Sequence, residues 1–209
     1  MEEVYPVGNT HKAYYDDVLV YFEREGFDSE DSHILVVGGE LIAWSVKDRY
    51  PESRVESIDV EERTLALQSS IAERLRSGED PADISQQIES RELRNFGEEW
   101  GTTYSGIVKE IGKNVVEPDV SRVQDVETYQ GDPDMIISNN VCDYAFGFVD
   151  AVERIDPDYV ELYTILPADK ITSDYNGRLE PDVNPDIDFW GSPGGKDDTV
   201  DIVLYSEES

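Results

Sequence analysis

The segment spanning residues 33–65 constrains the fold of this chain more than any other part of the sequence. An apolar run, ILVV at residues 34–37, meets the glycine pair Gly38-Gly39. A helix-length stretch follows, and a second run that alternates apolar and polar residues leads to Asp59, 21 positions after Gly38. A strand, a tight turn, a helix and a strand in this order are typical of a βαβ unit that places backbone N–H groups and one acid around a nucleoside.

Strand-like and helix-like patterns alternate along the rest of the chain. Strands are predicted at residues 34–37, 54–60, 121–126, 135–138, 159–166, 187–190 and 199–205. Helices are predicted at residues 10–25, from the glycine pair to Arg49, before Gly78, and at residues 143–154. The last two strands flank a turn rich in glycine and proline, GSPGGKDD, which predicts an antiparallel hairpin.

Residues 79–119 interrupt this alternation. They are polar, and we expect a helical insertion with two pieces at about 81–94 and 103–113; the aromatic-rich stretch 95–104 is a candidate lid or substrate platform. A chain of 209 residues suits one domain. We therefore predict a single α/β domain over residues 1–209, a three-layer sandwich with a mostly parallel seven-stranded sheet and a C-terminal antiparallel hairpin.

The charge balance is extreme, with 48 acidic against 17 basic residues and a formal net charge of −31. Disorder does not explain it, because the chain also carries 12 Tyr, 6 Phe and 3 Trp together with recurring apolar runs. The acids are spread along the chain, as expected for a folded protein of a halophile, adapted to high salt. The acidity is then a background property, which makes a nucleic-acid partner less favourable without excluding it.

The sequence indicates a cytoplasmic protein. Its one cysteine, Cys142, forbids an intramolecular disulfide and fits a reducing interior. No apolar run approaches the ~20 residues of a membrane helix, and the start MEEVYPVGN lacks the features of a signal peptide. His11, His33 and Cys142 form no metal-ligand pattern, so we expect no metal site.

Candidate binding residues fall at the ends of the first four predicted strands. Ligands of open α/β sheets bind at the carboxyl ends of the strands, where the strand order reverses. Gly38 and Gly39 follow the first strand, Asp59 closes the second, Asp125 lies in the third and Asn139 follows the fourth. We therefore expect these residues to line one crevice.

The chemistry of the first two strand ends suits a nucleoside that carries an amino group. Gly38 and Gly39 allow a ligand to approach the backbone closely; the alternative is that they only form a tight turn after the strand. Glu40 repels a pyrophosphate but accepts from a cationic or amino group. Asp59 suits a bidentate grip on ribose hydroxyls, although an acid before a helix is also stabilised by the helix dipole.

The third and fourth strand ends leave similar alternatives open. Asp125 accepts from an exocyclic amine such as adenine N6, or is one more surface acid. Asn139 holds a cofactor or substrate through its amide, with Asp143 or Tyr144 reaching a reacting group. The alternative for Asn139 and Asp143 is capping of the helix that follows.

The order of these features resembles that of the class I S-adenosylmethionine-dependent methyltransferases. The resemblance covers roughly residues 32–206, through the runs ILVVGGEL, VESIDVEE, RVQDVETY and DPDMIISNN and the terminal hairpin. It implies a Rossmann-like fold, S-adenosylmethionine as cofactor, and a methyl acceptor that is a small molecule, a protein or a nucleic acid. The implied cofactor-binding residues are Gly38, Gly39, Glu40, Asp59, Val60, Asp125, Val126 and Asn139, and the implied catalytic residues are Asn139, Asp143 and Tyr144.

Other functions of the same fold remain open. The VVGG run is similar to that of aminopropyltransferases of the spermidine synthase type, and Trp44-Ser45 is similar to a pair in RNA ribose methyltransferases. The reactive Asp of both groups would fall on Asn139. Val36 and Glu40 replace an acid and a glycine that the family usually has, which favours a non-catalytic module. The match of GGELIA to G-x-G-x-x-A leaves an NAD- or FAD-binding protein as a further alternative.

We predict that the protein loses structure in dilute buffer and regains it in molar KCl. Self-repulsion of a net charge of −31 opposes a compact state, and ~1 M salt shortens the Debye length to about 3 Å. Circular dichroism melts over a KCl series measure this effect. A melting temperature that stays constant across the series contradicts the prediction.

Overall fold

The computed structural model describes residues 12–38, 42–60, 62–91, 108, 116–139, 147–164, 182–183 and 201–206. Its strands are β1 His33–Val37, β2 Arg54–Asp59, β3 Val120–Val123, β4 Met135–Asn139, β5 Tyr159–Thr164, β6 Asp182–Val183 and β7 Asp201–Ser206. Its helices are α1 Lys12–Arg24, α2 Ile42–Arg49, α3 Glu62–Arg76, α4 Pro81–Arg91 and α7 Phe148–Ile155, with a 3-10 turn, η2, at Val126–Thr128.

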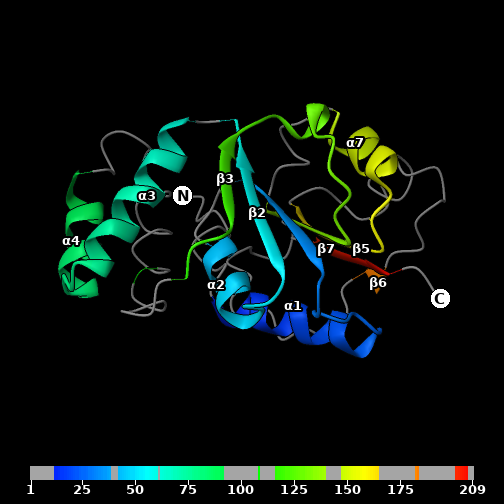
Figure 1. Ribbon diagram of the computed structural model, residues 1–209, viewed down its shortest axis with the longest axis horizontal. Helices are drawn as coiled ribbons and strands as arrows, with labels where there is room; N and C mark the ends of the chain where they lie inside the picture. The colour runs from blue at the N-terminus through cyan, green and yellow to red at the C-terminus, as the bar shows by residue number, and fades with distance from the viewer. Residues whose placement is uncertain are drawn as a thin grey trace.

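The described strands form one sheet in the order β3-β2-β1-β4-β5-β7-β6 (Figure 1). The five strands from β1 to β5 are parallel, which confirms the predicted α/β class with a parallel sheet. In the described residues β7 runs antiparallel to β5, and the two-residue β6 runs antiparallel to β7. The predicted strand at residues 187–190 lies outside the described residues, as does the predicted helix at 103–113 except for Val108.

The two faces of the sheet carry separate apolar cores. Side chains alternate between faces along a strand, so Ile34 and Val36 of β1 point to one face and Leu35 and Val37 to the other. Figure 1 shows α1 and α2 on one side of the sheet and α7 on the opposite side. The central strand is therefore buried between two helical layers, as its unbroken apolar run predicts.

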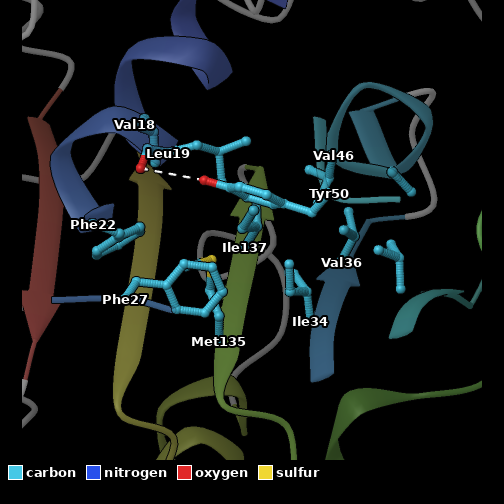
Figure 2. Close-up of a cluster of buried hydrophobic side chains, with 12 residues drawn as sticks. Val18, Leu19, Phe22, Phe27, Ile34, Val36, Val46, Tyr50, Met135 and Ile137 are labelled. Carbon is cyan, nitrogen blue, oxygen red and sulfur yellow. Dashed lines mark hydrogen bonds between the residues drawn. The ribbon is translucent and has the colours of Figure 1, made fainter. Parts of the chain in front are cut away.

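The core under α1 and α2 is rich in aromatic and branched side chains (Figure 2). Phe22 of α1 packs edge-on against Tyr159 of β5, with ring centroids 5.5 Å apart. Phe27 makes the same kind of contact with Tyr50, whose hydroxyl donates to a Glu23 carboxylate oxygen at 2.7 Å. Full burial of each such side chain contributes about 1.5–3 kcal/mol, so this core holds α1 on the sheet.

The other core is built by one face of α7. Phe148, Ala151, Val152 and Ile155 are all buried, at the i, i+3, i+4 and i+7 spacing of an amphipathic helix. The described part of the helix begins at Phe148, whereas the sequence predicted a start at 143, and residues 140–146 lie outside the described part.

A buried carboxylate, Glu56, lies in the middle of β2 on the α7 side, with 1% of its side chain exposed. It accepts from the Tyr129 hydroxyl at 3.1 Å and from the Arg122 guanidinium at 3.0 Å, and it also pairs with Arg54. His33 Nε2 lies 3.5 Å from the same carboxylate. Burial and the neighbouring Glu56 charge raise the pKa of Tyr129, so this hydroxyl remains a donor over the physiological range.

We predict that Glu56→Leu lowers the free energy of unfolding by about 3 kcal/mol, because it removes the acceptor of a buried, charge-assisted network. Tyr129→Phe, which removes one donor, should cost about 1 kcal/mol. Urea denaturation in molar KCl measures both, with the exposed Glu52→Gln as the control. A Glu56→Leu protein as stable as the wild type would show that the network contributes nothing.

Candidate functional site

The carboxyl ends of the central strands lie level with one another. Val37 of β1 is paired with the residue before Asp59 on β2 and with the residue before Asn139 on β4. Gly38, Asp59 and Asn139 therefore occupy equivalent positions on three neighbouring strands, which are spaced about 4.8 Å apart. β1 lies between β2 and β4, so the order of the parallel strands reverses here, at the type of position where α/β sheets bind ligands.

Gly38 has a backbone conformation that favours glycine. Its φ is +114°, and its N–H donates to the Ile58 carbonyl oxygen at 3.0 Å. A side chain is strained at this φ, which explains the glycine at the first position of the pair. Gly39 and Glu40, the other predicted binding residues of this turn, lie outside the described residues.

An acid and two exposed valines lie together at the ends of β2 and β3. Asp59 is partly buried and is paired with Val123, and the Gln124 N–H donates to the Asp59 carbonyl oxygen at 2.9 Å. Val60 is 68% exposed and Val123 is 54% exposed, and among the described residues these are the large hydrophobic side chains that solvent reaches most. This combination offers a carboxylate for hydroxyl groups beside apolar surface for a flat ring.

Asp125 lies in a turn, whereas the sequence placed it in a strand over 121–126. β3 ends at Val123, and Asp125 is the N-cap of η2, where its Oδ1 accepts from the Glu127 N–H at 2.9 Å. The Val126 side chain is buried in the α7 core, so it is not exposed beside Asp125. The sequence pattern did not separate this turn from the strand, because an Asp can either end a strand or cap a turn by accepting from the N–H two residues on.

The end of β4 is held by an acid that the sequence pattern does not single out. Glu161 of β5 has a fully buried side chain, and its Oε2 accepts from the Ser138 N–H at 3.0 Å. The Ser138 hydroxyl oxygen is also buried, and it is one of the few described buried side-chain atoms without a hydrogen-bond partner. The signal in the sequence was a lone acid inside an apolar strand, YVELYT, which reads equally well as a solvent-facing position.

The remaining predicted residues are only partly placed. Asn139 ends β4 beside Tyr163 of β5, and its side chain is outside the described part. Asp143 and Tyr144, the other predicted catalytic residues, lie outside the described residues. Within the described ranges, no three His, Cys, Asp or Glu side chains are grouped so as to hold a metal ion. The helices described there also include none that is long and apolar enough to cross a membrane.

Comparison with known proteins identifies the fold. No family model and no curated protein matches the sequence. A probable spermidine synthase from Corynebacterium glutamicum ATCC 13032 has a TM-score of 0.53 and 14% identity, over 95% of this chain and 63% of that chain. The rRNA methyltransferase aviRa from Streptomyces viridochromogenes has a TM-score of 0.50 and 12% identity, over 92% of this chain and 83% of that chain.

These similarities show that the chain has the Rossmann-like α/β fold of methyltransferases. EvdMO1 matches as well, with a TM-score of 0.50 and 10% identity over 92% of this chain and 40% of that chain. The chain thus spans less than two thirds of the spermidine synthase that it resembles, at 63%. At such low identities the similarity is one of fold, and function has to be argued from the site.

We predict that Glu161→Leu loosens the end of β4, because it leaves the buried Ser138 N–H without this acceptor. The expected loss in the free energy of unfolding is about 1–3 kcal/mol, with faster hydrogen exchange at the Ser138 amide. Glu161→Gln keeps an acceptor oxygen and is the matched control. Unchanged stability and exchange in the leucine variant would refute a role for this contact.

Proposed function

We propose that this protein is an S-adenosylmethionine-dependent methyltransferase. The observation that supports this best is the level arrangement of Gly38, Asp59 and Asn139 at the carboxyl edge of a Rossmann-like sheet, where the strand order reverses. The methyl acceptor is a small molecule, a protein or a nucleic acid. We also propose a halophilic, cytoplasmic protein whose single domain spans residues 1–209, with the helical insertion 79–119 and a C-terminal antiparallel hairpin that completes the seven-stranded sheet.

The described residues fit the adenosyl part of this cofactor. The backbone at Gly38 carries no side chain, so it permits the methionine moiety to approach closely. Asp59 accepts from the two ribose hydroxyls, since an ionised carboxylate offers two acceptor oxygens. Val60 and Val123 expose apolar surface on which adenine can lie. Asp125 keeps Oδ2 for the adenine amine while its Oδ1 caps η2.

The chemistry asks little of the protein beyond alignment. S-adenosylmethionine supplies an activated methyl group on a sulfonium ion. The residues at the end of β4 and just beyond it, Asn139, Asp143 and Tyr144, then orient the acceptor atom or take up its proton. Glu161 contributes indirectly, because its contact with the Ser138 N–H keeps the end of β4 before Asn139 in place.

A non-catalytic module with the same fold is the second candidate. Val36 occupies the position where the family usually has an acid, so the edge lacks that charge. The Val36 side chain is instead buried in the core, 2% exposed. Such a module would keep the sheet and lose cofactor affinity. An NAD-binding protein is the third candidate, and Glu40 after the glycine pair argues against it through repulsion of the pyrophosphate.

Calorimetric titration in molar KCl with S-adenosylmethionine, S-adenosylhomocysteine and NAD distinguishes the three candidates. We expect the first two ligands to bind and NAD to give no heat of binding. Asp59→Asn should weaken S-adenosylhomocysteine binding about 10- to 100-fold, because hydrogen bonds to a charged group are worth about 1.5–3 kcal/mol.

Asp48→Asn is the control, since Asp48 is an exposed acid on α2 and its loss changes the net charge equally. If none of the three ligands binds, the result supports the non-catalytic module. Binding of NAD alone supports the NAD-binding protein. Equal affinities of the two variants for S-adenosylhomocysteine would remove Asp59 from the site.

A further inference from the structure

We infer that Arg154 and Glu127 form a latch between α7 and the η2 turn, and that this latch positions Asp125 for recognition of the adenine amine. The inference rests on the proposed function, because it assigns Asp125 to a bound adenosine. Both residues act through the turn and need not touch the ligand, so they are positioning residues.

The first half of the latch is the Arg154 guanidinium, which satisfies three backbone carbonyls of the turn. It donates to the carbonyl oxygen of Tyr129 at 2.6 Å, of Glu127 at 3.1 Å and of Val126 at 3.3 Å. The Val126 carbonyl oxygen also accepts from the Tyr129 N–H within the turn, at 3.1 Å. A cation at the end of a helical turn is stabilised by the partial negative charge of the carbonyls there. One side chain of α7 therefore holds the backbone from Val126 to Tyr129.

In the second half of the latch, a side chain of the turn contacts the backbone at the start of α7. Glu127 Oε1 accepts from the N–H of Gly147, the N-cap residue of α7, at 3.1 Å. A Cβ on Gly147 would lie 2.4 Å from the Glu127 carboxylate, so a side chain larger than hydrogen displaces it. The glycine is explained by this close approach, since its φ of −92° is open to any residue.

The turn held in this way also sets the position of Asp125. The Glu127 N–H donates to Asp125 Oδ1 at 2.9 Å, and the Thr128 N–H donates to the Asp125 carbonyl oxygen at 3.0 Å. A shift of the Glu127 backbone therefore moves the Asp125 carboxylate with it. The two halves of the latch thus join the Asp125 turn to both ends of α7, at Gly147 and at Arg154.

The preference for adenine tests the latch, because the ratio of two ligand affinities does not change when the protein is only less stable. The affinities for S-adenosylhomocysteine and S-inosylhomocysteine are compared by calorimetry in molar KCl; the second ligand has a carbonyl in place of the adenine amine. We expect the wild type to prefer the adenosyl compound. Arg154→Lys, Gly147→Ala and Glu127→Ala should each reduce this preference about tenfold or more, which corresponds to the loss of one charge-assisted hydrogen bond.

Two variants serve as controls. Glu127→Gln keeps the acceptor oxygen and should retain the preference of the wild type. Arg49→Lys weakens an ion pair with Glu23 on the other face of the sheet and should lower stability without altering the preference. If the wild type binds S-adenosylhomocysteine and the three latch variants keep its preference, the latch is overturned alone. If the wild type does not bind it, the proposed function fails and the latch fails with it.

Discussion

Burial of β1 on both faces is the constraint on which the rest of the structure depends. Its alternate side chains enter two different cores, one under α1 and α2 and the other under α7, while its backbone is paired with β2 and β4. A strand enclosed in this way cannot slip by one residue without reversing which core each side chain enters. The register therefore sets where β1 ends, and with it the level at which Gly38, Asp59 and Asn139 meet.

The chain has few basic residues, and several of them join segments of the structure to one another. Lys47 joins α2 to the start of β3 through Asp119 at 2.8 Å, Arg122 joins β3 to Glu56 of β2, and Arg154 joins α7 to η2. These contacts link segments far apart in the sequence, where local structure offers no alternative. Burial alone would raise the pKa of Asp119, but hydrogen bonds from Lys47 and the Val55 N–H lower it overall, so the Lys47 contact persists in mildly acidic solution.

The parallel sheet could be predicted because apolar runs such as ILVV and MII at residues 135–137 are long enough to be buried on both faces, and each ends at a turn or polar group. The position of Gly38 and Asp59 followed from the same pattern. Glu56 and Glu161 escaped prediction, because an acid inside a strand normally alternates toward solvent. Partners from other segments, Arg122 and Tyr129 for Glu56 and the Ser138 N–H for Glu161, make burial tolerable.

Local patterns thus established the α/β class, the parallel strands and the residues at two strand ends, because side-chain periodicity and turn chemistry act over a few residues. Tertiary structure decided the strand order, the level alignment of the edge and the Arg154 contacts that hold the Asp125 turn. These features depend on hydrogen bonds between segments far apart in the sequence, such as Arg154 and Tyr129, which are 25 positions apart. Such pairings are set by the packing of whole layers, which leaves no periodic trace in the chain.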